Sequence, residues 1–223
     1  MTPINFKELK EVEKQVLKGI SLIFPNIEPK TIAGFDVSFF ENKAVCSVVV
    51  LDLKTLEVLE KKHTVNEEIM PYNPNISVFR EAPPIIETLK QLENQPDTLL
   101  IDGAGALHAN KAGVASYVGV LVNKPTIGLM KELMHARLEE DKIMVNNEQK
   151  GTAVRLRPFA NPIYITPGHN MSMEKAVELV KQVAGENKLP LPLHLAHKIT
   201  IQVKKELKEL RGEQENGKNK SRL

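Results

Sequence analysis

Three strand-like runs follow one another closely near the start of the chain, and they restrict its fold more than any other feature. They span Ile32–Phe40, Ala44–Leu51 and about Leu56–Val65, and they are rich in β-branched and aromatic residues. The linkers 41–43 and 52–55 are far shorter than a parallel crossover, which needs a dozen residues or more. We therefore expect the three runs to form an antiparallel meander.

Helical and strand patterns alternate after this meander. Apolar residues at helical spacing predict a helix over 77–94, in which Pro83 and Pro84 are tolerable only in the first turn. The other predicted elements are an amphipathic N-terminal helix carrying Leu9, Val12, Val16 and Ile20, strands over 98–101, 125–129 and 162–165, a hairpin over 141–157 around Asn146-Asn147, and helices over about 111–122, 172–183 and about 194–210. The order β-β-β-α-β-α-β predicts a mixed sheet flanked by helices, which is the element order of the ribonuclease H-like α/β fold.

A single domain accounts for most of the 223 residues. No repeat or linker interrupts 1–210, whereas 211–223 is polar and is expected to be a disordered tail. The net charge of +2 is unevenly distributed, because seven Lys or Arg oppose four Asp or Glu between Lys204 and Leu223. A solvated helix end explains this basic run, so composition alone does not argue for nucleic acid.

The sequence also indicates where the protein works. Its one cysteine, Cys46, excludes an intrachain disulfide and suits a reducing cytosol. No apolar run approaches the roughly 20 residues of a membrane span, and the N-terminus has no secretory signal pattern. We therefore expect a cytoplasmic, monomeric protein without a membrane partner.

Three acidic residues lie in apolar settings that normally exclude charge. Asp36 interrupts the strand TIAGFDVSFF, Glu81 ends FRE at the start of a helix, and Asp102 ends the run TLLID. Burying a lone carboxylate is costly, so such groups are usually paired, hydrogen-bonded or bound to a metal. In ribonuclease H-like folds, carboxylates come from these same three places. Together the three predict a site for Mg²⁺ or Mn²⁺, although each one alone is also explained as a capping or loop carboxylate.

Basic and imidazole side chains offer further candidates. Lys131 follows the strand PTIGLM and is either a group that neutralises phosphate or a plain surface lysine, and His108 lies in a Gly-containing loop. His194 and His197 face one side of a helix, and the lack of other nitrogen or sulfur ligands nearby argues against zinc. We expect one of the two to join the carboxylates.

Tyr72 lies between Pro71 and Pro74 in a stiffened loop. An aromatic ring on such a loop can stack on a base or enter a helix stack. The alternative is a tyrosine that packs its own loop onto the domain.

These motifs together resemble endonuclease V, a nuclease family that acts at deaminated adenine (inosine). The matching pieces are IAGFDVSF, MPYNP, FRE, IDGAG followed by His108, GVAS, PTIGLMK and TPGH, in family order between Ile32 and His197. Several positions depart from the family pattern: Ala104 and Tyr117 stand where histidine is frequent, Asn73 where an aliphatic residue is common, and His194 where arginine is common.

The resemblance implies specific roles. It implies a metal site for Mg²⁺, with Mn²⁺ as a substitute, at Asp36 and Asp102 with Glu81 completing the cluster. The other implied residues are Lys131 near the scissile phosphate, His197 as a fourth catalytic residue, Tyr72 with Pro71 and Pro74 as a strand-separating wedge, and Gly105, His108 and Gly128 around the base.

The implied activity is metal-dependent cleavage of DNA on the 3′ side of inosine, in DNA repair. The first alternative is the same chemistry on inosine-containing RNA. The second alternative is a non-catalytic relative that binds nucleic acid.

Overall fold

The computed structural model describes residues 5–25, 27–67, 70–108, 110–133 and 136–220, with residues 212–220 described as backbone only. In chain order the elements are α1 (Phe6–Lys18), β1 (Thr31–Phe40), β2 (Lys43–Asp52), β3 (Val58–Glu67), α2 (Val78–Lys90), β4 (Thr98–Asp102), α3 (Val114–Val122), β5 (Thr126–Met130), β6 (Arg137–Glu139), β7 (Lys142–Val145), β8 (Glu148–Val154), β9 (Ile163–Pro167), α4 (Met173–Gln182) and α5 (Leu191–Lys220).

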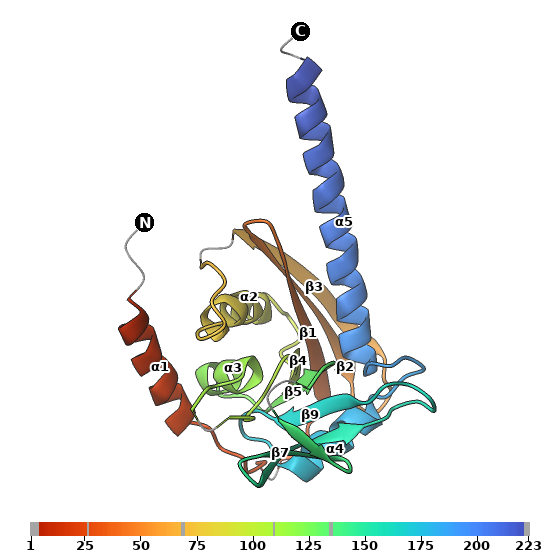
Figure 1. Ribbon diagram of the computed structural model, residues 1–223. Helices are drawn as coiled ribbons and strands as arrows, with labels where there is room; N and C mark the ends of the chain where they lie inside the picture. Colours follow the sequence, from red (N-terminus) through yellow and green to blue (C-terminus); the bar gives the residue numbers. More distant parts are fainter. Residues whose placement is uncertain (1–4, 26, 68–69, 109, 134–135, 221–223) are drawn as a thin grey trace.

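The strands of the described chain form one sheet in the order β3-β2-β1-β4-β5-β9-β8-β7-β6 (Figure 1). β1, β2 and β3 pair antiparallel, which confirms the predicted meander. β4 is parallel to β1, to which β2, β3 and α2 connect it, and β5 is parallel to β4, to which α3 connects it. The result is the mixed sheet of a ribonuclease H-like fold, as predicted.

The far edge of the sheet contains a predicted hairpin and a strand that was not predicted. β7 and β8 pair around Asn146 and Asn147, whose φ angles of 51° and 63° are those of a two-residue hairpin turn. The three-residue strand β6 pairs with β7 and is exposed throughout. Such a short polar run carries no alternation from which a strand is predicted.

Helices cover both faces of the sheet (Figure 1). On one face, α1, α2 and α3 pack on Phe35, Val48 and Ile101. On the other face, α4 and α5 pack on Ile32, Val49 and Leu100. Neighbouring residues of one strand belong to opposite cores, as the two-residue period of a strand requires.

Gly34 determines how closely α5 approaches the sheet. A Cβ atom at this position would lie 2.5 Å from the backbone nitrogen of Leu193 and 2.5 Å from the carbonyl carbon of Pro192. The start of α5 therefore rests on the bare backbone of β1. Because strand side chains alternate, Asp36 and Ser38 project toward the same helix as Gly34.

Helix α2 begins earlier than its two prolines suggest. We expected Pro83 and Pro84 in the first turn, but the helix starts at Val78 and both lie in its second turn. The first turn closes upstream, where the Arg80 and Glu81 amides donate to the Ser77 carbonyl at 2.9 and 3.0 Å. The prolines supply no N–H groups for the carbonyls of Phe79 and Arg80.

The terminal helices differ in detail from their predicted patterns. In α1, Val16 is buried as expected, whereas Val12 is 41% exposed and Glu13 is only 1% exposed. Helix α5 continues past Leu210 to Lys220. Residues 221–223 and the side chains of 212–220 lie outside the described residues, so the disorder of the tail 211–223 stays a prediction. No helix in the described part of the chain has the length and apolar character needed to cross a membrane.

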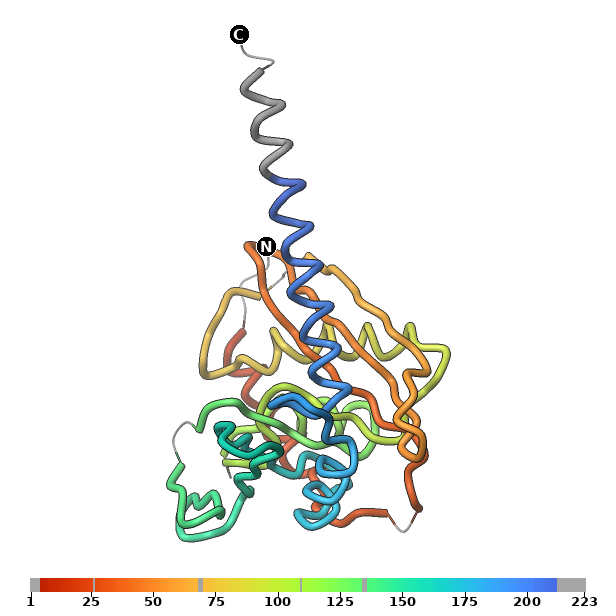
Figure 2. The backbone as a smooth tube through the Cα atoms, turned by 90° about the vertical axis from the view of Figure 1, so that its right-hand side faces the viewer, coloured from red at the N-terminus to blue at the C-terminus, as the bar shows by residue number. Residues whose placement is uncertain are grey.

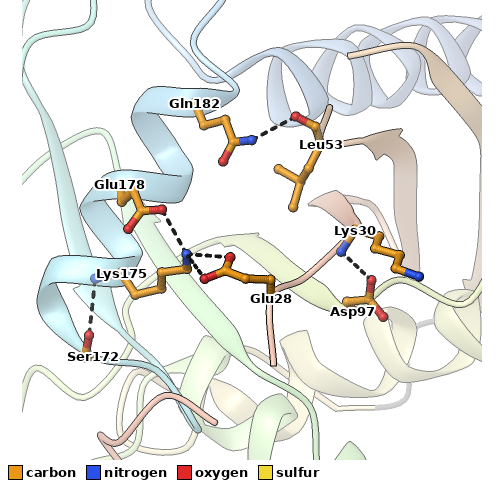
Figure 3. A network of polar contacts seen from close by, with 8 residues as sticks. All are labelled: Glu28, Lys30, Leu53, Asp97, Ser172, Lys175, Glu178 and Gln182. Atoms are coloured by element: carbon orange, nitrogen blue, oxygen red, sulfur yellow. Dashed lines mark hydrogen bonds and ion pairs between the residues drawn. The ribbon is translucent and has the colours of Figure 1, made fainter. Parts of the chain in front are cut away.

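Polar contacts join the segment between α1 and β1, and the loop after β2, to the rest of the domain (Figure 3). Lys175 Nζ of α4 lies 2.9 Å from Glu28 and 2.8 Å from Glu178. The Lys30 amide donates to Asp97 at 2.8 Å, and Gln182 donates to the Leu53 carbonyl at 2.9 Å. These contacts hold α4 and the start of β1 at the end of the sheet opposite Phe40.

The close contact at Gly34 yields a stability prediction. Gly34→Ala should lower the free energy of unfolding by about 1–3 kcal/mol, because the added methyl group meets backbone rather than a movable side chain. Urea unfolding measures the change. Gly185→Ala is the matched control, since its Cβ would lie no closer than 3.6 Å to its neighbours. Equal effects of the two substitutions would contradict the close approach of α5.

Candidate functional site

Asp36 and Asp102 are neighbours because of the register between two parallel strands. Phe35 of β1 pairs with Ile101 of β4, so the next residue of each strand projects from the same face. Adjacent strands are about 4.8 Å apart, which places the two carboxyl groups side by side. Asp36 is 4% exposed, and both residues line one cavity of about 600 Å³.

Burial and repulsion act together on Asp102. Burial raises the pKa of Asp102, the Lys131 ammonium lowers it, and the neighbouring Asp36 carboxyl raises it, with a net upward shift. Lys131 Nζ lies 2.5 Å from Asp102 Oδ2. Lys131 follows β5, the strand next to β4, and this position brings the lysine beside Asp102. Its predicted role at a phosphate stays a prediction.

His197 reaches the same cavity from α5. Its Nδ1 lies 3.2 Å from Asp36 Oδ1, and Thr200, one turn further along the helix, donates to the Asp36 backbone carbonyl at 3.5 Å. An ionised carboxylate only accepts hydrogen bonds, so Nδ1 is the donor and Nε2 is left as the second polar atom of the ring. His197 is therefore the histidine that joins the carboxylates. His194 lies elsewhere, with its Nε2 buried, and lines neither of the two cavities described here.

Glu81 lies beside a second cavity rather than in the first one. This cavity of about 250 Å³ is also lined by Ser77, Gly105 and His108. Burial raises the pKa of Glu81, while Ser77 and Lys111 lower it and Asp102 raises it. The effect of Asp102 shows that the two carboxyl groups interact, although they line different cavities.

The three carboxylates do not form a closed metal cluster in this structure. Among the described residues, no three His, Cys, Asp or Glu side chains are arranged to hold a metal ion. The donor set at Asp36 and Asp102 nevertheless fits Mg²⁺, which is often held by one or two carboxylates together with water and substrate phosphate. Burial, together with the neighbouring Asp36 carboxyl, raises the pKa of Asp102 despite the nearby Lys131, and a cation bound between the two carboxylates would favour their ionised forms.

Two glycines allow the backbone segments around the second cavity to pack closely. A Cβ at Gly105 would lie 2.3 Å from the Pro167 carbonyl oxygen, and a Cβ at Gly128 would lie 2.3 Å from the Gly105 nitrogen. Gly105 lines the cavity, whereas Gly128 lies under the loop that contains Gly105. Ala104 and His108 also line the cavity, and Tyr117 is instead buried against Phe79 with ring centroids 5.3 Å apart.

Tyr72 lies on an exposed loop and lines neither cavity. Its side chain is 68% exposed, and Pro71 and Pro74 flank it on the surface. Lys111 Nζ donates to the Pro74 carbonyl at 2.5 Å and ties this loop to the segment that lines the second cavity. The ring is therefore presented to solvent rather than packed into the core.

Sequence patterns missed two residues that support the site. The Arg80 guanidinium lies 4.0 Å from the Phe39 ring centre and 5.6 Å from the Tyr72 ring centre, so it links β1 to the loop. Arg80 is the middle residue of the motif FRE, from which the sequence pattern predicted a role for Glu81 alone. Buried Glu13 accepts a hydrogen bond from the Ala112 amide at 3.2 Å and so fixes part of the second cavity to α1. Nothing in the polar pattern of α1 distinguishes Glu13 from the other acidic residues there.

Comparisons with known proteins identify relatives along most of the chain. A family model described as Endonuclease V matches residues 13–198. The endonuclease V of Thermosipho melanesiensis is 31% identical over 210 residues, which are 90% of this chain and 92% of that protein.

Solved structures agree with the sequence comparison. The crystal structure of endonuclease V from Streptomyces avermitilis has a TM-score of 0.85 at 26% identity and covers 92% of this chain and 96% of its own. Ciona intestinalis endonuclease V has a TM-score of 0.79 at 26% identity, with 92% and 98% covered. It was solved in complex with a 24mer DNA containing an inosine followed by a ribo-adenosine.

The raised pKa of Asp102 predicts how stability depends on pH in metal-free buffer. The folded state favours the protonated carboxyl, so the ionised form destabilises the protein at neutral pH, and this penalty disappears as the pH falls through the folded-state pKa. Asp102→Asn should therefore keep or raise the free energy of unfolding at neutral pH, and its advantage over the wild type should shrink at lower pH. Urea unfolding in EDTA at several pH values measures this difference.

Asp52 provides a control of opposite sign. Hydrogen bonds from the Thr55 and Lys54 amides lower its pKa, so its ionised form contributes stability that is lost as the pH falls through the folded-state pKa. Asp52→Asn should lower stability at neutral pH and not at low pH. A large loss for Asp102→Asn at neutral pH would contradict the conclusion that burial and the Asp36 carboxyl make ionised Asp102 unfavourable in the folded state.

Proposed function

The chain belongs to the endonuclease V family, and on that premise we propose that it is a metal-dependent endonuclease that recognises inosine in DNA and hydrolyses a phosphodiester bond on its 3′ side. The observation that carries this proposal is the placement of Asp36, Asp102, Lys131 and His197 in one cavity beside a second, glycine-lined cavity. Such an activity fits a role in repair of deaminated DNA.

The first cavity has the groups that phosphodiester hydrolysis needs. Asp36 and Asp102 would hold Mg²⁺ or Mn²⁺, with Glu81 as the third carboxylate. The chemistry that such a cation supplies is activation of water near neutral pH and stabilisation of charge on the phosphate. Lys131 is close enough to Asp102 to neutralise a neighbouring phosphate oxygen as well.

His197 has two roles in this proposal. Its hydrogen bond to Asp36 fixes the orientation of that buried carboxylate, as outer partners of metal ligands commonly do. Its Nε2 is then available to accept a proton from water or to hold water in place. The side chain is 38% exposed, so solvent reaches the ring.

The second cavity and the Tyr72 loop suit recognition of a flipped base. Enzymes that act at a base in a duplex commonly extrude it into a pocket, and small residues permit close approach of the backbone. Gly105 and His108 line this cavity, and the exposed Tyr72 ring can occupy the space that the base leaves. This arrangement supports inosine recognition beside the cleavage site.

Inosine-containing RNA is the second candidate substrate. The DNA bound by the Ciona intestinalis relative contains a ribo-adenosine directly after the inosine. A relative that accepts a ribonucleotide there makes an RNA strand a reasonable substrate for this chain as well. Contacts to the 2′-hydroxyl would decide between the two.

Cleavage assays test the proposal directly. Matched inosine-containing and adenine-containing strands of DNA and RNA are incubated with the protein in Mg²⁺ or in EDTA, and the cut positions are mapped. We expect cuts 3′ to inosine only with the metal, and severe loss of cleavage for Asp36→Asn and Asp102→Asn. Asp52→Asn is the matched control and should cleave normally. Binding without cleavage under all conditions would instead identify a non-catalytic relative.

Tyr72 tests recognition separately from chemistry. Tyr72→Ala should weaken binding to inosine-containing duplex by about 1–3 kcal/mol, the range for one base–aromatic stack. The loss should be smaller when the inosine is already unpaired, because unstacking then costs less. Fluorescence anisotropy in EDTA measures the binding.

The control for this prediction is Phe159→Ala, which removes a different exposed aromatic ring that lines neither cavity. It should leave binding unchanged. Equal losses for Tyr72→Ala on inosine and adenine duplexes would indicate a damaged loop rather than a lost stacking contact.

A further inference from the structure

Three lysines of α5 extend the first cavity away from the carboxylates. Lys204, Lys205 and Lys208, here called the lysine row, line the same cavity as Asp36 and Asp102. Figures 1 and 2 show α5 running along the hairpin of β1 and β2 in the direction of the hairpin turn. The row thus leads from the carboxylates toward Phe40.

Contacts with β1 hold part of the row in place. Lys204 Nζ donates to Ser38 Oγ at 2.7 Å, and Lys208 Nζ lies 5.7 Å from the Phe40 ring centre. Ser38 and Phe40 are on the face of β1 that carries Asp36, so successive turns of α5 follow successive residues of that face. Lys204 and Lys208 are about one helical turn apart, roughly 5.4 Å along the axis, and Lys205 is next to Lys204, so the row places three positive charges within about one turn of α5.

The charges along this surface do not cancel. The cavity is lined by four lysines, which are Lys131 and the lysine row, against the two carboxylates Asp36 and Asp102. Lys205 is 76% exposed and lies 3.8 Å from Glu209, a loose pair that contributes little at the surface. Glu41 pairs with Arg211, and Glu206 accepts a hydrogen bond from Gln202. Positive charge therefore remains available to an anionic ligand.

The two cavities lie on different sides of the end of β5. Lys131 lines the first cavity, whereas Met130 and Glu132 on either side of it line the second. Consider a strand that places one base in the second cavity and its next phosphates beside Asp102 and Lys131. Such a strand would continue into the first cavity. The lysine row is the surface that it would meet there.

We propose that the lysine row binds the phosphates of the cleaved strand beyond the scissile bond, on its 3′ side. This inference rests on the proposed function for the direction of the strand. Lysine side chains bind phosphate through charge without reading sequence, so the row positions the strand and does not select inosine. The contact is the same for adenine-containing and inosine-containing strands.

Binding experiments with strands of different length test the lysine row. Two kinds of single strand are used, which share the same 5′ part and carry either a long 3′ arm or almost none. Each is bound to the protein in EDTA, and anisotropy measures the dissociation constant over a range of salt concentrations. The variant is Lys205→Gln with Lys208→Gln, since both lysines are exposed. Lys54→Gln with Lys181→Gln is the charge-matched control, because both of its lysines are exposed and line neither cavity.

We expect the row variant to lose affinity several-fold on the long-armed strand and to lose much less on the short one. The slope of log affinity against log salt should decrease by about 1.4, which corresponds to two phosphate contacts on a single strand. Urea unfolding midpoints equal to the wild type would show that the fold is intact.

Two results would overturn the proposal: an equal loss for the row variant and the control variant, or a loss that does not depend on the 3′ arm. Cleavage of inosine-containing DNA by the wild type is measured separately in Mg²⁺. If the wild type cleaves but the row variant shows no loss of affinity that depends on the 3′ arm, the proposal for the lysine row alone is rejected. If the row variant shows that loss but the wild type does not cleave, the proposed function alone is rejected.

Discussion

The parallel pairing of β1 with β4 determines the location of the candidate chemistry. This pairing places Asp36 and Asp102 on one face of adjacent strands, at the point where β4 ends. Two carboxylates so close together and so buried are unfavourable unless positive charge accompanies them. Lys131 after β5 supplies that charge beside Asp102, and His197 on α5 contributes a hydrogen bond to Asp36. The position of α5 depends in turn on Gly34, because the helix rests on its backbone.

Much of this arrangement follows from sequence patterns. The short linkers and apolar alternation predicted the meander and the mixed sheet, and Asn146-Asn147 predicted the second hairpin. Asp36 and Asp102 were predicted, with Glu81, to form one cluster because charged groups are unusual inside or at the end of apolar elements. The resemblance to the family added Lys131 and His197. The helix bounds were less predictable, since the start of α2 depends on the turn at Ser77 rather than on the prolines that dominate its composition.

Other features depend on tertiary contacts that leave no trace in a local pattern. Glu13 is one of many charged residues on α1, and only the packing of α1 on Ala112 makes it buried. The role of Arg80 arises from Phe39 and Tyr72, which come from different parts of the chain. The separation of Glu81 from the other two carboxylates is also a matter of tertiary geometry, because the three residues were predicted as a single cluster from strand and helix positions alone.

The prolines of α2 have a mechanical consequence for Glu81. Without amide hydrogens at Pro83 and Pro84, the turn that carries Glu81 lacks two of the hydrogen bonds that would join it to the next turn. Ile85 and Leu89 anchor the later part of the helix in the core. Backbone hydrogen bonds therefore join the first turn to the rest of α2 less completely than in an uninterrupted helix. Side-chain packing of buried Val78 and Ala82, more than the backbone ladder, thus fixes where the Glu81 carboxylate lies relative to Asp102.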